Sequence, residues 1–395
     1  MKKVLFVSSS VEKGLQKFKN HVQFFKDSLY EVYFIGKSKT EDLKNVDYSI
    51  DFEFPDVLNK RDEKKLIKKL RTLFPEKLDV IITFEEISGY LVRMASRSFF
   101  NRRSDMFTIH IAEEYNFKAG DESRALVMQK KAAGSTDALV VMNQKDFEIA
   151  KSEKLSSNKL VRMHGLGFKS ILNEFSVLNK NEMRQKYKIP FMSFSAFYEN
   201  PFTKQKNQKA LIMLLKNILN LNPHFLLLLK GEGPLKDEIK AMVKARGYEE
   251  HVRFLSEDTP SEEILAFTDI VISSALCEGI PEHILQALEC QVPVFAPDIK
   301  GIRDVVEEGV NAELYIDAPI MPIKLYYLME NFDELLKLRQ NPSKKIKYFY
   351  TENAEKEMFK YYSESINEHE ELHKKEKSVF VFNAEHYKEK YPLAK

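Results

Sequence analysis

Short apolar runs alternate with longer amphipathic stretches along most of this 395-residue sequence. The alternation is typical of strand–helix–strand units, which build a parallel sheet with helices on both faces. In the first half, the apolar runs predict strands at residues 4–7, 31–35, 80–83, 106–110, 138–142 and 160–163. In the second half, they predict strands at residues 191–196, 225–229, 252–255, 270–273, 292–296 and 312–316. The sequence therefore predicts an α/β protein with two doubly wound domains.

The expected domain boundaries lie where this pattern changes. Residues 167–190 are polar and end in Ile189-Pro190, where the proline biases the preceding residue toward an extended conformation. After residue 330 the strand pattern stops, and Glu, Lys, Leu and Tyr recur at helical spacing. We therefore predict a first domain over residues 1–170, a linker over 171–190 and a second domain over 191–330. A helical tail over 331–395 is expected to pack back across the hinge.

The net charge is close to zero, since 61 basic and 59 acidic residues give +2. A chain with this balance has no overall field to recruit nucleic acid, so no nucleic-acid partner is expected. Cys277 and Cys290 are too few for a disulfide framework or a tetrahedral zinc site, which favours a reducing compartment. The apolar run of four residues near the amino terminus is shorter than the core of a signal peptide. We expect a cytoplasmic protein.

Two loops of the second domain carry the clearest chemical signals, because ligands of parallel sheets bind at the carboxyl ends of the strands. Gly231, Glu232 and Gly233 follow the apolar run 225–229, and glycines let a ligand approach the backbone closely. A plain strand-to-helix turn explains this loop equally well. In the loop 277–281, Glu278 precedes a glycine and a proline at the start of a helix. Its carboxylate either caps the helix or accepts hydrogen bonds from sugar hydroxyls.

These loops carry a resemblance to a known family. The order of GEGPL, VRFL and EILAFTDIVISSALCEGIPEHILQALECQVPVFAP resembles the nucleotide-binding domain of the GT-B glycosyltransferases of family 4, chiefly the bacterial polysaccharide members. In that family an E-x7-E motif binds the donor. Glu278 matches the first glutamate, while Gln286 stands at the second, where the family glutamate accepts hydrogen bonds from ribose hydroxyls. The amide still accepts through its carbonyl but carries no charge.

The resemblance implies a set of donor-binding residues. Lys206, in Lys-Asn-Gln, matches a family lysine that contacts the donor diphosphate, whereas residues 195–203 hold no match to the arginine that many members carry. The backbone near Leu255 and Ser256 is expected to face the base. The full implied set is Gly14, Lys206, Gly231, Glu232, Gly233, Leu255, Ser256, Glu278, Gly279, Ile280, Pro281 and Gln286.

The first domain resembles the family at its predicted fourth strand and its first loop. His110, in TIHIAEEYNFKAG, matches a strand-end histidine that lies near the reacting sugar in the family. The alternative is a structural histidine, the usual role of a lone histidine at a strand end. Residues 8–14 occupy a loop that in the family touches donor phosphate and acceptor, and Gly14 is its one glycine.

The resemblance implies a GT-B fold of two Rossmann-like domains and a retaining transfer, with His110 and Glu278 as catalytic residues. The donor is expected to be a nucleotide sugar, most simply a UDP-sugar, and the acceptor a glycan, a lipid-linked glycan or a glycoprotein. Because the nucleotide sugar is a substrate, no cofactor is expected, and no Asp-x-Asp pair calls for a metal. The alternatives are a non-catalytic GT-B protein that assists another transferase or binds a glycan, and a GT-B epimerase. Gln286 and the missing arginine favour the non-catalytic alternative.

A basic and apolar stretch predicts a contact with the membrane surface. Between Arg93 and Arg103, four arginines are mixed with two phenylalanines, and residues 60–77 are also basic. Surfaces of this composition bind anionic lipid headgroups, although a solvated helix face is the commoner explanation. We expect a cytoplasmic protein with peripheral contact at the inner face of the cell membrane.

Overall fold

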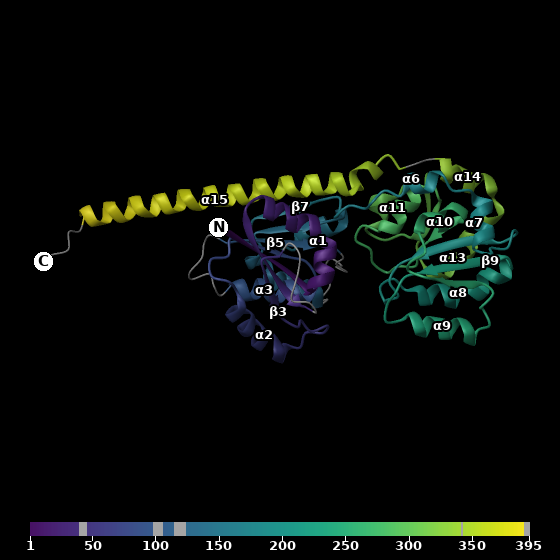
Figure 1. The fold of residues 1–395 in the computed structure, drawn as a ribbon, viewed down its shortest axis with the longest axis horizontal. Coiled ribbons are helices and arrows are strands. Elements are labelled where there is room, and N and C mark those ends of the chain that lie inside the picture. The colour runs from purple at the N-terminus through teal and green to yellow at the C-terminus, as the bar shows by residue number, and fades with distance from the viewer. Residues whose placement is uncertain (39–45, 98–105, 114–123, 341–342, 391–395) are drawn as a thin grey trace. The chain divides into compact units, whose positions relative to one another are not determined.

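The computed structural model describes residues 1–38, 46–97, 106–113, 124–340 and 343–390 (Figure 1). The chain divides into two compact units. Unit 1 comprises Met1–Val141, Asp146–Met163 and Glu355–Lys395, and unit 2 comprises Met142–Lys145 and His164–Ala354.

Unit 1 is built on a seven-stranded parallel sheet with the strand order β3-β2-β1-β4-β5-β6-β7. Its strands are β1 (Lys2–Ser10), β2 (Tyr30–Lys37), β3 (Tyr48–Asp51), β4 (Val80–Thr83), β5 (Phe107–Ala112), β6 (Ala138–Val141) and β7 (Lys159–Arg162). Its helices are α1 (Val11–Asp27), α2 (Lys60–Leu73), α3 (Glu86–Arg97), α4 (Arg124–Ala132) and α5 (Gln144–Ser152), with a short 3₁₀ turn at Ala133–Ser135.

The central strand of unit 1 shows why apolar runs predicted this sheet. Val4, Leu5, Phe6 and Val7 are fully buried, since helices cover both faces of a doubly wound sheet and the strand needs no polar side. Helix α1 then begins at once, because the Ser10 side chain accepts a hydrogen bond from a backbone NH of its first turn. The expected loop over residues 8–14 is therefore a strand end that passes directly into a helix.

Unit 2 is built on a six-stranded parallel sheet with the order β10-β9-β8-β11-β12-β13. Its strands are β8 (Phe194–Glu199), β9 (Phe225–Lys230), β10 (Val252–Leu255), β11 (Ile270–Ile272), β12 (Val294–Pro297) and β13 (Ala312–Tyr315). Its main helices are α8 (Gln208–Leu221), α9 (Lys236–Ala245), α10 (Ser261–Phe267), α11 (Glu282–Glu289), α12 (Ile302–Val305), α13 (Met321–Glu330) and α14 (Phe332–Gln340). In chain order within each sheet, both units follow the 3-2-1-4-5-6 arrangement of Rossmann-like folds.

The segment expected to be a linker is helical and packs within unit 2. It forms α6 (Leu172–Ser176) and α7 (Lys180–Lys186). Arg184 of α7 is buried, donates to Asp269 at 2.9 Å, and also donates to the carbonyl oxygen of Pro190. These contacts tie residues 171–190 to the amino ends of the strands of their own unit.

The final helix, α15 (Thr351–Lys390), begins in unit 2 and continues in unit 1 from Glu355 (yellow in Figure 1). Within unit 1 it packs against α1, where His21 Nδ1 lies 3.0 Å from the buried Tyr362 hydroxyl. Burial lowers the pKa of His21 to about 4, so the ring is neutral at pH 7. None of the helices in the described part of the chain has the length and apolar character to cross a membrane.

Candidate functional site

The strand order of unit 2 reverses between β8 and β11, which opens the carboxyl edge of the sheet at that point. Ligands of doubly wound sheets bind at such reversals, because the loops on either side diverge. The segment after β8 supplies Lys206, and the segment after β11 supplies Glu278. The topology therefore brings together two residues that are 72 positions apart in the sequence.

Lys206 and Glu278 form a buried ion pair at this point. Lys206 Nζ lies 2.7 Å from Glu278 Oε2, and the two side chains are 8% and 3% exposed. Charged groups are stable at this depth only when they are paired and hydrogen-bonded. Asn200 Nδ2 donates to the other carboxylate oxygen of Glu278 at 3.3 Å. The backbone of Lys206 is held as well, because the Tyr198 hydroxyl donates to its carbonyl oxygen at 2.7 Å.

His283, in the first turn of α11, completes this buried group. Its Nδ1 lies 3.3 Å from Asn200 Nδ2, and the side chain is buried. Burial, together with the nearby Lys206 cation, lowers the pKa of His283 to about 3. The imidazole is thus neutral at pH 7 and accepts a hydrogen bond from the Asn200 amide. Sequence patterns did not single out Asn200, which directly follows β8, or His283, which lies in the first turn of α11.

Three glycines with positive φ let the loops of this site pack against one another. A Cβ on Gly231 would lie 2.3 Å from the Asn200 carbonyl oxygen, and one on Gly301 would lie 2.2 Å from that of Gly279. Gly233 packs in the same way on the backbone of Phe202. The bare backbones of Gly231 and Gly233 therefore meet the chain itself. Their expected role in admitting a ligand stays a prediction.

The remaining predicted donor residues lie around this edge of the sheet. Leu255 ends β10 and is half-buried, and the exposed Ser256 follows it. The Glu232 side chain pairs with Lys236 in the next turn of the chain. Pro281 is the residue that precedes α11, directly after Gly279 and Ile280, and Gln286 lies half-buried on that helix. Their contacts with a nucleotide sugar stay predictions.

In unit 1, His110 is enclosed in the core. The side chain is fully buried on β5, and Nδ1 lies 2.7 Å from the Thr83 hydroxyl. Burial, followed by the charge of Arg93, holds the pKa of His110 well below its ordinary value. This environment fits a neutral, structural ring. Contact with a reacting sugar would require the ring to become exposed, so the catalytic role stays a prediction.

Gly14 also has a packing role in this structure. It lies within α1, where a Cβ would approach the Phe34 ring to 2.5 Å and the Ser8 Cβ to 2.8 Å. Glycine is needed here because the helix lies close against the sheet. The predicted contact of Gly14 with the donor has no support from this geometry.

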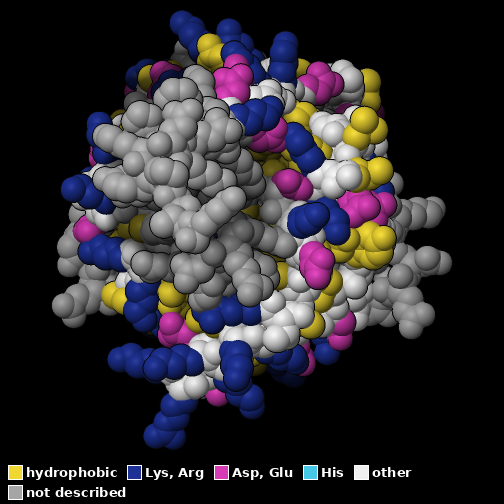
Figure 2. Space-filling view, turned by 90° about the vertical axis from the view of Figure 1, so that its left-hand side faces the viewer, with side chains coloured by type: hydrophobic (Ala, Val, Ile, Leu, Met, Phe, Trp, Pro, Cys, Tyr) yellow, Lys and Arg dark blue, Asp and Glu magenta, His cyan; other side chains and the backbone are white. Residues whose placement is uncertain are grey.

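The predicted membrane-contacting stretch is corrected at its first residue. Arg93 is fully buried and donates to the Gly89 carbonyl, the Thr136 hydroxyl and the Gln129 amide oxygen. The guanidinium makes its hydrogen bonds inside the core, so the Arg93 side chain does not reach a lipid surface. Residues 98–103, including Arg103, lie outside the described residues. Figure 2 shows Lys and Arg side chains projecting from the lower part of the face it draws, and α2 carries several exposed lysines. The exposed lysines of this helix are Lys60, Lys64, Lys65, Lys68 and Lys69.

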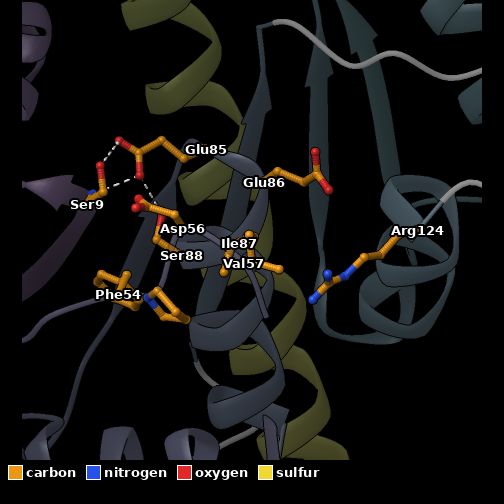
Figure 3. A pocket seen from close by; sticks show the side chains of 10 residues that line it. Ser9, Phe54, Asp56, Val57, Glu85, Glu86, Ile87, Ser88 and Arg124 are labelled. Carbon is orange, nitrogen blue, oxygen red and sulfur yellow. Dashed lines mark hydrogen bonds between the residues drawn. The ribbon is translucent and has the colours of Figure 1, made fainter. Parts of the chain in front are cut away.

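Unit 1 holds a second candidate site, which sequence patterns did not reveal. A cavity of about 420 Å³ lies beside the carboxyl ends of β1 and β4, where the strand order of this sheet reverses (Figure 3). Glu85 and Glu86, one residue after the predicted strand 80–83, are the sequence signal that marks it. Among the residues that the structure describes, no group of three or more His, Cys, Asp or Glu side chains is placed to hold a metal ion.

Comparisons with known proteins agree with this architecture. Residues 179–345 match the family model described as glycosyl transferases group 1. The "Putative glycosyltransferase EpsD" of Bacillus subtilis is 24% identical over 79% of this chain and 83% of its own length. The Escherichia coli UDP-Gal:alpha-D-GlcNAc-diphosphoundecaprenol alpha-1,3-galactosyltransferase is 24% identical over 64% of this chain and 66% of its own length.

Solved structures match nearly the whole chain. Anabaena HepE in complex with UDP has a TM-score of 0.68 at 16% identity, covering 92% of this chain and 100% of its own. Sucrose-phosphate synthase from Thermosynechococcus elongatus has a TM-score of 0.70 at 13% identity, covering 93% and 100%. At these identities the matches establish the fold. The chain thus has the GT-B fold of two Rossmann-like units, and its residues 179–345 are similar to the group 1 glycosyltransferases.

Proposed function

We propose that this protein is a retaining, metal-independent glycosyltransferase that moves a sugar from a UDP-sugar to a glycan or lipid-linked glycan in polysaccharide synthesis. The observation that carries the proposal is the buried Lys206–Glu278 pair at the strand reversal of unit 2. The similarity to known transferases agrees with it, since one relative is a galactosyltransferase that uses UDP-Gal and a diphosphoundecaprenol-linked sugar. A structural neighbour was solved with UDP-glucose.

In this proposal Lys206 and Glu278 separate when the donor binds, and each then contacts the donor. The donor diphosphate takes the Lys206 ammonium, and hydroxyls of the donor sugar donate to Glu278. Both charged groups stay satisfied throughout, so the exchange avoids leaving a buried charge unpaired. Backbone NH groups at the start of α11 add to the diphosphate contact. Gln286 contacts the ribose through its amide, and the backbone at Leu255 and Ser256 faces the base.

The chemistry asked of the site is then mainly electrostatic and positional. The bond from the sugar C1 to the departing UDP oxygen breaks, and a bond from C1 to the acceptor oxygen forms on the same face. The acceptor hydroxyl gives its proton to the departing diphosphate. Lys206 stabilises the negative charge that develops on that leaving group, which is the interaction that strengthens in the transition state.

A non-catalytic GT-B protein is the second candidate. Its supporting observations are the neutral Gln286 and the presence of Asn200, an amide without charge, beside Glu278. Because residues 195–203 hold no match to the family arginine, Lys206 would face the diphosphate without that second positive charge.

Calorimetric titration with UDP, UDP-glucose, UDP-galactose and UDP-N-acetylglucosamine tests both candidates. We expect UDP to bind, and at least one UDP-sugar to bind more tightly than UDP. Glu278→Gln should remove that sugar-dependent gain while UDP itself still binds. Glu238→Gln, which removes an exposed glutamate on α9, is the matched control. If no nucleotide binds, the donor site and the enzyme proposal both fail. If donors bind but are neither transferred nor hydrolysed, the non-catalytic candidate is supported instead.

Gln286→Glu separates the two candidates further. A carboxylate accepts hydrogen bonds more strongly than an amide, so the variant should tighten UDP binding by about tenfold if Gln286 faces the ribose. An unchanged or weaker affinity would show that this residue does not contact the nucleotide.

A further inference from the structure

One wall of the unit 1 cavity is held in place by the carboxylate of Glu85. Glu85 accepts hydrogen bonds from the Ser8 hydroxyl at 2.8 Å, the Ser9 NH at 2.7 Å, the Ser9 hydroxyl at 3.0 Å and the Ser88 hydroxyl at 2.9 Å. Ser8 and Ser88 are buried. Glu85 therefore joins the end of strand β1 to the first turn of helix α3 and fixes their positions relative to each other. The Glu85 carboxylate already accepts four hydrogen bonds from the protein. We therefore assign it a role in shaping the cavity and not in binding a ligand.

Two further carboxylates line the cavity on different sides. Figure 3 shows Asp56 beside Glu85 on one side, with Glu86 and Arg124 on the other. Asp56 is exposed in the segment before α2. Burial raises the pKa of Glu86, although the Arg124 guanidinium opposes that effect. Three carboxylates against one guanidinium leave the lining with a net charge of −2.

Apolar side chains complete the lining. Phe54, Pro55, Val57 and Ile87 contribute carbon surface between the polar groups. A site of about 420 Å³ that combines apolar walls with a few fixed polar groups has the size and character of small-ligand sites, which span about 300–1,000 Å³. Sugar rings present C–H faces as well as hydroxyl donors, and both features find partners here.

We propose that this cavity binds the terminal sugar of the acceptor and selects one that is neutral or carries an amine. Carboxylates at Asp56 and Glu86 accept hydrogen bonds from hydroxyl or ammonium groups. A carboxylate or phosphate on the sugar would instead meet a lining of its own sign, which a single Arg124 does not neutralise. The proposal rests on the proposed function for the identity of the ligand as an acceptor. The selection by charge rests on the cavity alone.

The test uses three simple glycosides that differ mainly in charge. Methyl α-glucoside is neutral, methyl 2-amino-2-deoxy-α-glucoside carries an ammonium group, and methyl α-glucuronide carries a carboxylate. Saturation-transfer NMR titrations on the full chain at low ionic strength give their dissociation constants, and UDP binding is measured on the same samples. The variants are Asp56→Asn and Glu86→Gln. The control is Glu76→Gln. Glu76 is exposed in the loop before β4, at the amino ends of the strands, whereas the cavity lies at their carboxyl ends.

We expect the amine glycoside to bind most tightly and the glucuronide at least about tenfold more weakly. Combining Asp56→Asn with Glu86→Gln should compress this range to within about threefold, while Glu76→Gln leaves it unchanged. Equal binding of the three glycosides, tighter binding of the glucuronide or no binding of any would overturn the proposal. If UDP binds in those cases, the donor site stands while the cavity proposal fails. If the glycosides rank as expected and UDP does not bind, the cavity is a sugar site and the transferase proposal fails.

Discussion

Removing the charge of Lys206 while keeping its length should destabilise unit 2 strongly. In Lys206→Met, the apolar stem stays, but the Glu278 carboxylate loses a partner at 2.7 Å and remains 3% exposed. Asn200 still donates to the Glu278 side chain, at 3.3 Å. Breaking one side of a buried ion pair costs about 3–5 kcal/mol, because the remaining charge is desolvated without compensation.

The chain contains a matched control for this estimate. Lys209 and Glu238 form an ion pair of nearly the same length, 2.8 Å, but their side chains are 50% and 48% exposed. Exposed pairs of this kind contribute about 0–1 kcal/mol. Lys209→Met should therefore change stability by less than about 1 kcal/mol, and the difference between the two variants measures the effect of burial.

Hydrogen exchange of peptides from β8 and β11, followed by mass spectrometry across a urea series, reports the stability of unit 2 specifically. The double variant Lys206→Met/Glu278→Gln should recover at least about 2 kcal/mol of the loss, since it removes the unpaired charge. If Lys206→Met costs no more than Lys209→Met, the pair does not bury its charges as described. An absence of recovery in the double variant would show that the loss comes from packing.

Three further predictions concern loop packing, pH and the buried arginine. Gly301→Ala should weaken UDP binding at least about tenfold and lower the unfolding temperature, because its Cβ would lie 2.2 Å from the Gly279 carbonyl oxygen. The control is Gly309→Ala, whose Cβ would have nothing within 4 Å and which should cost only about 1 kcal/mol of backbone strain in a thermal melt. His21 has a pKa of about 4 in the folded chain and 6.5 as its ordinary value, so unit 1 should lose about 2–3 kcal/mol as pH falls from 7 to 4.5. This follows because the unfolded chain takes up the proton first, and His21→Phe should reduce the loss in urea titrations at the two pH values. Arg93→Met should cost about 3 kcal/mol or more in urea titrations, because it removes three hydrogen bonds that the guanidinium makes in the core; a change below about 1 kcal/mol would contradict its place in the core.

The apolar runs were sufficient to predict most of the fold, because each central strand is buried on both faces. Each of the predicted strands overlaps one in the structure. Strand β3 was not predicted, since Tyr48–Asp51 lies at the sheet edge and its residues are mainly exposed and polar. Strand β8 begins at Phe194 and not at residue 191, because Phe191 and Met192 are 83% and 72% exposed despite their apolar side chains. Hydrophobicity alone does not distinguish an exposed apolar turn from a strand.

The candidate sites depend on tertiary topology, which local patterns do not contain. Glu278 and Lys206 were each identified by resemblance, but their pairing follows from the neighbouring positions of β8 and β11. Asn200 was noticed only as part of a segment without an arginine, and its contact with Glu278 needed the fold to become visible. The unit 1 cavity likewise joins residues from three separate segments and Arg124.

The division of the chain also sets an order of folding during synthesis. Unit 1 starts at the first residue, yet it is completed only by residues from Glu355 onward. Unit 2 ends at Ala354, so the ribosome delivers it whole before the last 41 residues of unit 1 appear, roughly 2–8 s later at about 5–20 residues per second. During that interval the aromatic face of α1 that α15 covers, including Phe24 stacked on Phe359, lacks its partner. The nascent protein therefore exposes this aromatic surface of unit 1 until the residues of α15 have been synthesised.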